Sequence, residues 1–116
     1  MTQVMIWHNP RCSKSRATMA LLREHGIEPE VVRYLEDTPS AKAIERVLET
    51  LGVPPRLLMR TKETKYRQMG LAEEQSDEAL IAAMVANPVL IERPIVICGK
   101  RAAIGRPPEN ALKALP

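Results

Sequence analysis

The order of apolar and polar positions predicts a strand, a helix and a second strand in the first third of the chain. Residues 4–8 form a short apolar run that leads into Asn9-Pro10, and a residue before proline favours extended backbone, as in a strand entering a loop. Across residues 12–25 the apolar positions recur at helical spacing, and Gly26 follows as a left-handed stop. Residues 31–35 are rich in β-branched side chains and predict a second strand. This order favours a right-handed unit with two parallel strands.

The middle of the chain is predicted to be entirely helical. Thr38 has the character of a helix cap, and Pro39 after it suits a first turn. Shorter helices are expected over residues 54–60 and 64–69, and Ser76 is expected to cap a further helix. The helical block therefore extends from about residue 38 to residue 87.

The last part of the chain returns to strands. Residues 93–98 and 101–105 flank Gly99-Lys100, which predicts a hairpin with a two-residue turn, and residues 107–115 predict a closing helix. Without the helical block, the order β-α-β followed by β-β-α is that of a thioredoxin-like or glutaredoxin-like domain. The predicted fold class is therefore α/β, thioredoxin-like, with a helical insertion between the second and third strands of a single domain over residues 1–116.

Composition and charge exclude several classes of function. A chain of 116 residues suffices for one domain with its own core. A net charge of +3 and only three aromatic residues argue against a nucleic-acid partner. The chain has no apolar run of about 18 residues and its N-terminus does not resemble a signal peptide, so we expect a cytoplasmic protein without a membrane partner. We also expect a monomer. Its two cysteines have no zinc-binding spacing, so we expect free thiols and no metal.

Cys12 is the main candidate for chemistry, because it stands at the predicted start of a helix. Backbone N–H groups and the helix dipole at that position favour thiolate, and can lower a cysteine pKa from about 8.5 into the range of about 3.5–7.5. His8, Arg11, Lys14 and Arg16 would add positive charge if their side chains turn inward. A small buried, inert cysteine is the alternative. The polar and basic flanks favour a nucleophile instead.

The residues around Cys12 also exclude some thiol chemistries. Arg16 gives the spacing C-x3-R, which differs from the C-x5-R of phosphatase-type cradles. Ser15 stands where a C-x-x-C pair would have its second cysteine. Cys98 is expected roughly 13 Å along a strand from Pro94, the residue predicted to face Cys12, which is beyond disulfide reach. We therefore interpret Cys98 as structural and expect an external thiol such as glutathione to clear any adduct.

Three arginines are candidates for binding an anion. Arg93 and Arg106 each precede a proline, and the hairpin between them should bring both connections to one end of the sheet. Guanidinium groups beside a helix N-terminus suit a tetrahedral oxyanion. Arg60 could join them only if the helical block folds back over that end. Each arginine taken singly is more commonly a solvated surface residue.

The segments HNPRCSKSR, RYLEDTP, LLMR, NPVLIERPIV and IGRPPE, in this order, resemble the glutaredoxin-dependent arsenate reductase family over nearly the whole chain. Within that family the chain is most similar to a bacterial branch with Cys-Ser-Lys-Ser. Reductases of this type typically have Gly-Thr where this chain has Ser13-Lys14, which changes the space and charge beside the sulfur.

The resemblance implies specific roles. Cys12 would be the catalytic thiol, His8 would help to lower its pKa, and a cis peptide would precede Pro94. The oxyanion, arsenate or a similar one, would be held by Arg60, Arg93 and Arg106. Cys12 would attack arsenic with loss of water, glutathione would attack the adduct, and glutaredoxin would reduce the mixed disulfide as arsenite leaves. Glutathione would be a co-substrate, and no cofactor would be bound. For His8, a strand-end hydrogen-bonding role is an equal alternative.

Two other functions remain open. The same fold resembles redox-responsive regulators that dock on RNA polymerase, but those usually have C-x-x-C, which Ser15 removes here. A glutathione-dependent thiol transferase would need Cys12 but not the three arginines together.

Overall fold

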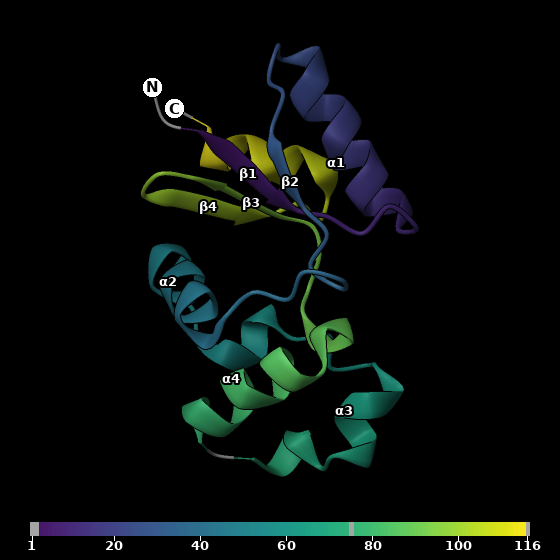
Figure 1. The fold of residues 1–116 in the computed structure, drawn as a ribbon, viewed down its shortest axis with the longest axis vertical. Helices are drawn as coiled ribbons and strands as arrows, with labels where there is room; N and C mark the ends of the chain where they lie inside the picture. Colours follow the sequence, from purple (N-terminus) through teal and green to yellow (C-terminus); the bar gives the residue numbers. More distant parts are fainter. Residues whose placement is uncertain (1–2, 75, 116) are drawn as a thin grey trace. The chain divides into compact units, whose positions relative to one another are not determined.

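The first strand, β1 (Val4–Trp7), lies inside a four-stranded sheet of order β2-β1-β3-β4. In the computed structural model, which describes residues 3–74 and 76–115, β1 pairs in parallel with β2 (Glu30–Val32). On its other side it pairs antiparallel with β3 (Ile95–Cys98), which pairs antiparallel with β4 (Arg101–Ile104). The ends of β1, β2 and β4 and the start of β3 therefore lie at one end of the sheet (Figure 1).

One face of this sheet is covered by α1 (Ser13–Glu24) and by the 3₁₀ helix η4 (Pro108–Ala114). Apolar side chains from alternate strand positions meet those of the two helices, as the period of two along a strand requires. The buried members of this cluster are Val4, Ile6, Met19, Leu22, Val96, Cys98, Ala103, Ala111 and Ala114. Burial of this cluster removes apolar surface from water and holds the N-terminus of α1 at a fixed place on the sheet.

Helix α1 begins and ends at the residues that the sequence indicates. Cys12 is its N-cap, with extended backbone angles, and Gly26 has a φ of 74°. The N–H of Gly26 donates to the carbonyl of Arg23 and that of Ile27 donates to Leu22, each at 3.0 Å. These two bonds form a Schellman motif, which satisfies carbonyl groups that the helix end would otherwise leave without donors.

The thioredoxin-like α/β fold is confirmed, with corrections at several elements. The second strand is shorter than predicted, because residues 33–37 form a turn in which the N–H groups of Glu36 and Asp37 donate to the carbonyl of Arg33. The closing helix is 3₁₀ rather than α, as shown by the bond from the N–H of Asn110 to the carbonyl of Pro107. The hairpin turn at Gly99 is as predicted.

The segment between β2 and β3 is helical, as predicted, and extends further than residue 87. It contains α2 (Ala41–Leu51), η1 (Pro55–Leu58), α3 (Thr64–Gln68), η2 (Leu71–Glu73), α4 (Asp77–Ala86) and η3 (Pro88–Leu90). Ser40, and not Thr38, caps α2 by accepting a hydrogen bond from the N–H of Ala43 at 3.1 Å. Ser76 caps α4 as expected.

The contacts within the chain divide it into two compact units. One comprises Met1–Asp37 with Arg93–Pro116, and the other comprises Thr38–Glu92. The single domain over residues 1–116 stays a prediction. Within residues 3–74 and 76–115, no helix combines the length and the hydropathy of a membrane span.

Gly105, just after β4, lies in close contact with α1 and with Pro94. A Cβ atom at this position would lie 2.7 Å from Thr18 Oγ1 and 2.8 Å from Cγ of Pro94. Both neighbours are held in place, because Thr18 donates a hydrogen bond to the carbonyl of Lys14 and the N–H of Gly105 donates to the carbonyl of Pro94. A glycine is therefore needed where α1, β3 and β4 meet.

We expect Gly105→Ala to destabilise the protein by about 1–3 kcal/mol, because the added methyl group has no space in this contact. Urea unfolding followed by circular dichroism measures the loss. The double variant Thr18→Ala/Gly105→Ala should lose less than the sum of the single variants, since one of the two clashes is removed. Strictly additive losses, or a Gly105→Ala protein as stable as the natural chain, would contradict this account.

Candidate active site

The site is built around Cys12, which β1 and α1 place at one end of the sheet. The chain leaves β1 at Trp7, and the N–H of Cys12 donates to the carbonyl of Asn9 at 3.0 Å before the helix begins. Arg16 closes the same loop from the helix side by donating to the carbonyl of Pro10 at 2.9 Å. Cys12 is 9% exposed. Its sulfur therefore lies in a tight loop at the N-terminus of α1.

A buried hydroxyl fixes this loop on the first turn of the helix. Ser15 is fully buried, and its Oγ accepts a hydrogen bond from the N–H of Asn9 at 3.1 Å. The same Oγ lies 2.7 Å from Nδ1 of His8, to which it donates when that nitrogen carries no proton. Ser15 thus joins the end of β1, the loop and the helix.

The two predicted connections of the hairpin meet at this end of the sheet. Nε of Arg106 donates to the carbonyl of Arg93 at 2.8 Å, and Nη2 of Arg106 lies 3.8 Å from Sγ of Cys12. The peptide bonds before Pro94 and Pro107 are both cis. Cys12 and Arg106 are 94 positions apart in the sequence, so only the fold brings them together.

The pKa of the Cys12 thiol lies below its ordinary value, although burial of the sulfur raises it. The groups that lower the pKa are the backbone N–H of Ser15, the positive charge of Arg93, the backbone N–H of Lys14 and the positive charge of Arg106. The two N–H groups form no capping hydrogen bond of conventional geometry with Sγ, so they act chiefly as oriented dipoles. Together these groups favour a thiolate.

The charges that act on Cys12 differ from those expected from its neighbours in the sequence. Arg11, Lys14 and Arg16 have exposed side chains, and the side-chain charges that lower the pKa come from Arg93 and Arg106. The geometry of the first helical turn explains why these neighbouring charges have little effect on the sulfur. The first turn of a helix presents its backbone to the N-cap, whereas its long side chains point outward.

His8 is buried, and its own pKa is lowered, first by burial and then by the positive charges of Arg33, Arg23 and Arg16. The imidazole is therefore neutral near pH 7, and its Nδ1 shares a hydrogen bond with the hydroxyl of Ser15. A neutral ring adds no positive charge beside the sulfur. His8 can therefore affect the Cys12 thiol only indirectly, through the hydrogen bond with Ser15, which holds the loop before Cys12.

Two other predicted residues have surroundings of their own. Cys98 is buried in the apolar cluster under the sheet, as a structural cysteine would be, and both cysteines are free thiols. Arg60 belongs to the second unit, where its N–H donates to the carbonyl of Leu90 and its side chain pairs with Glu63 at 3.1 Å. A role for Arg60 in the oxyanion site stays a prediction.

Sequence reasoning missed Ser15 and Gly105 as positioning residues. Ser15 drew attention only as the residue that replaces a second cysteine. Its place at the third position of a helix beside a proline-containing loop is a usable signal, because short polar side chains there bond to nearby backbone. Among the described residues, no group of three or more His, Cys, Asp or Glu side chains could hold a metal ion.

We expect alkylation of Cys12 by iodoacetamide to titrate below the value of about 8.5 of a free cysteine. Arg106→Gln should move the midpoint to higher pH, because it removes a positive charge that lies 3.8 Å from the sulfur. Arg11→Gln is the matched control, since it removes an exposed charge next to Cys12 in the sequence. Equal midpoints in the two variants would contradict the role of Arg106.

The lowered pKa of His8 makes stability depend on pH. The unfolded chain binds a proton at His8 near the ordinary value of 6.5, whereas the folded chain binds it only at lower pH. Stability is therefore fully present above 6.5 and decreases as the pH falls below it. We expect His8→Gln to flatten this slope in urea unfolding from pH 7.5 to 5. His25→Gln, which removes the other histidine, should keep the pH dependence of the natural chain. If His8→Gln also keeps it, the assignment to His8 is wrong.

Comparison with known proteins shows that the chain is similar to one protein family over most of its length. A model of the ArsC family matches residues 7–114. The chain is 55% identical over 113 residues to "Uncharacterized protein YfgD" of Escherichia coli K12, covering 96% of this chain and 95% of that protein. It is 45% identical over 112 residues to an arsenate reductase of Neisseria meningitidis, covering 95% and 96% of the two chains.

Among solved structures, an arsenate reductase from Vibrio cholerae has a TM-score of 0.95 and 49% identity over 98% of each chain. A putative arsenate reductase from Yersinia pestis has a TM-score of 0.91 and 50% identity, covering 95% of this chain and 98% of that one. With its thiol, helix N-terminus and paired arginines in one fold, and with a match over nearly its whole length, the chain belongs to the ArsC family.

Proposed function

We propose that this protein is an arsenate reductase, an oxidoreductase that converts arsenate to arsenite with thiols as the reductant. The observation that carries the proposal is the position of Cys12 Sγ, at the N-terminus of α1 and 3.8 Å from the guanidinium of Arg106. A nucleophilic thiolate beside fixed positive charge is what attack on an oxyanion requires. The names of relatives from Neisseria and Vibrio support the same substrate.

The residues of the first unit suit the first chemical step. Arg93 and Arg106 would hold arsenate through charge-assisted hydrogen bonds, and Arg60 would complete the set. The Cys12 thiolate would attack arsenic, and one arsenate oxygen would leave as water after taking up protons. Neutralisation of the oxyanion charge by the arginines lowers the repulsion between the anionic nucleophile and its anionic target.

The second step needs an external thiol. Reduction of As(V) to As(III) takes two electrons, which two thiols supply when they join as one disulfide. Ser15 stands at the place of a resolving cysteine, and Cys98 is buried in the apolar cluster, so glutathione is the proposed co-substrate. Glutaredoxin would then reduce the mixed disulfide, and the net change would be one arsenate and two thiols to one arsenite, one disulfide and one water.

Ser13 and Lys14 begin α1, and both are exposed. Their backbone N–H groups lie in the first turn whatever the side chains are, and the N–H of Lys14 contributes to the low pKa of Cys12. Binding of an anion therefore does not depend on the Gly-Thr pair that is typical of other reductases. Lys14 adds a positive side chain close to the site.

We expect arsenate-dependent consumption of NADPH in an assay with glutathione, glutaredoxin and glutathione reductase, and loss of this activity in Cys12→Ser. Cys98→Ser is the matched control, because it alters the other cysteine without touching the site, and it should retain turnover. Turnover that persists in Cys12→Ser, or is absent from the natural chain, would refute the proposal.

The same assay distinguishes arsenate reduction from a general thiol-transferase activity. Arg60→Ala and Arg93→Ala should lose arsenate turnover by a factor of 10 or more, on the order expected for removal of one charged hydrogen bond. Reduction of a simple mixed disulfide needs Cys12 alone, so it should survive in both variants.

A further inference from the structure

A groove of about 660 Å³ lies beside the loop that carries Cys12, between α1 and β2. Its walls are formed by residues of the first unit only, including Arg16, Arg23, Arg33 and Asp37. Within the described part of the chain, Cys12, Arg93 and Arg106 do not line it. Its volume falls within the range of about 300–1,000 Å³ that is usual for small-molecule sites.

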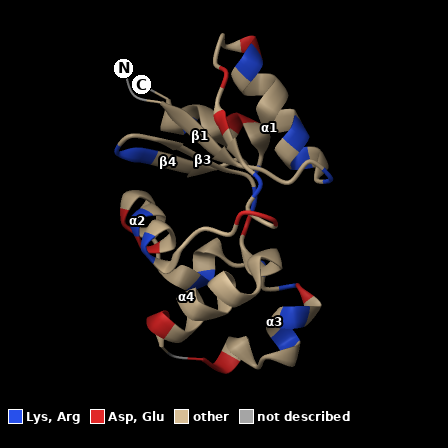
Figure 2. Cartoon of the chain, viewed as in Figure 1, with Lys and Arg blue, Asp and Glu red and all other residues tan. Residues whose placement is uncertain are grey.

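Three guanidinium groups reach this groove from two elements. Arg16 and Arg23 lie near opposite ends of α1, where Figure 2 shows basic residues, and Arg33 follows β2. All three act on the imidazole of His8, which also lines the groove, so their charges converge on one region. Arg23 pairs with Glu28 through two contacts of 3.2 Å, and Arg16 uses Nη1 to donate to the carbonyl of Pro10. Arg33 and the other N–H groups of Arg16 are the donors that can meet a ligand.

The groove also has one acidic side chain and an apolar wall. Asp37 is the carboxylate among its lining residues, and Met19, Ala20 and Val31 supply apolar surface. Val31 is 41% exposed, which is high for a β-branched residue in a strand. The chemistry that matches is a small ligand with two carboxylates, one ammonium group and a short apolar middle part.

We propose that this groove binds glutathione, with its two carboxylates on Arg16 and Arg33 and its ammonium group on Asp37. The inference rests on the proposed use of glutathione as the reductant. Glutathione has two carboxylates and one ammonium group at neutral pH, which is the inverse of this set of side chains. The groove adjoins the Cys12 loop, because Pro10 lines it two residues before the thiol and Arg16 lines it one helical turn after.

A second hollow of about 240 Å³ lies beside the groove on the same loop. It is also lined by His8, Pro10 and Arg33, and it adds Asn9, Arg11, Leu35 and a second carboxylate, Glu36. The groove and the hollow therefore lie on the two sides of the same three residues. A tripeptide is long enough to extend from the groove toward this hollow, whereas a single oxyanion is not.

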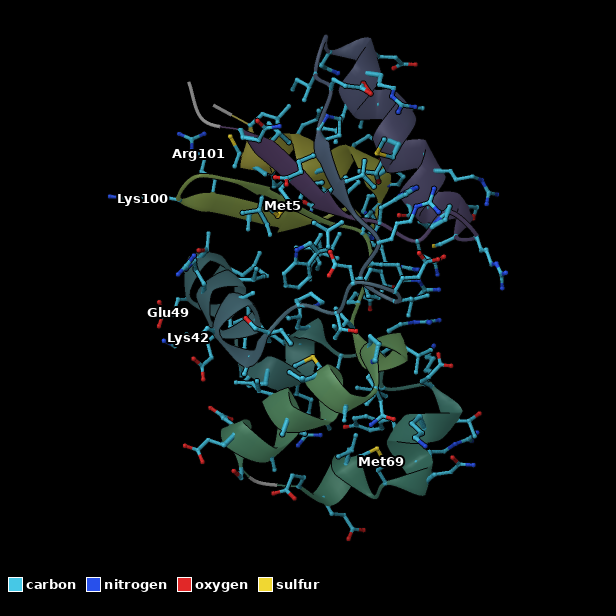
Figure 3. All side chains as sticks on the ribbon, in the orientation of Figure 1. Met5, Lys42, Glu49, Met69, Lys100 and Arg101 are labelled. Carbon is cyan, nitrogen blue, oxygen red and sulfur yellow. The ribbon has the colours of Figure 1, made fainter. Side chains whose placement is uncertain are left out.

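The binding test uses the Cys12→Ser chain, which removes the reactive thiol, and S-methylglutathione, which cannot exchange disulfides. We expect saturable binding by calorimetry and amide shifts confined to the groove residues in NMR spectra. Arg33→Gln should weaken binding at least tenfold. Lys100→Gln is the matched control: it also removes one positive charge, but at the hairpin turn, where Lys100 projects away from the sheet (Figure 3).

A second variant tests the ammonium contact separately from the overall charge. Asp37→Asn should weaken S-methylglutathione at least fivefold, yet leave succinate, which has two carboxylates and no ammonium group, bound equally or more tightly. Equal weakening of both ligands would mean that Asp37 acts on the fold and would overturn its assigned contact.

The binding test does not depend on arsenate. If S-methylglutathione binds as expected while arsenate turnover is absent, the groove assignment stands and the proposed substrate fails. If turnover is present, Arg33→Gln should raise KM for glutathione and leave KM for arsenate unchanged. Equal affinities in Arg33→Gln and Lys100→Gln, shifts confined to residues outside the groove, or no binding at millimolar ligand would each overturn the assignment.

Discussion

The contact of Gly105 with Thr18 and Pro94 is the constraint on which the rest of the site depends. It brings the end of β4 against the first turns of α1, where a side chain larger than hydrogen has no space. Arg106 follows directly, and its guanidinium can therefore reach both the carbonyl of Arg93 and the sulfur of Cys12. Without that approach, the thiol and the arginines would belong to separate surfaces.

The state of Cys12 reflects a balance of opposing effects. Burial disfavours the charged form, whereas two backbone N–H groups and two guanidinium groups favour it, and the second set prevails. Ser15 keeps the backbone groups in position by holding the loop against the helix with its buried hydroxyl. The reactivity of the thiol is thus a property of the backbone around it and of distant arginines, and less of the basic side chains beside it in the sequence.

The loop from His8 to Cys12 separates two charged regions with different geometry. On the side of β3 and β4, the charges of Arg93 and Arg106 act on one sulfur atom, which suits a compact oxyanion. On the side of β2, the charges are spread along a longer groove with one carboxylate and an apolar wall. The proposed reaction joins an oxyanion to a larger thiol, and the loop lies next to one region that suits each of them.

The sequence by itself determined the strands, the helical middle segment, the start of α1 at Cys12 and the meeting of the Arg93 and Arg106 connections. These features follow from local rules of periodicity, capping and hairpin geometry, which act over a few residues. Only the tertiary structure decided which charges reach the sulfur, that His8 is neutral and bonded to Ser15, that Gly105 allows the close contact, and that a groove lies beside β2. Those features depend on distances between residues far apart in the chain, and the free energy of a charge or a contact changes steeply with distance and burial.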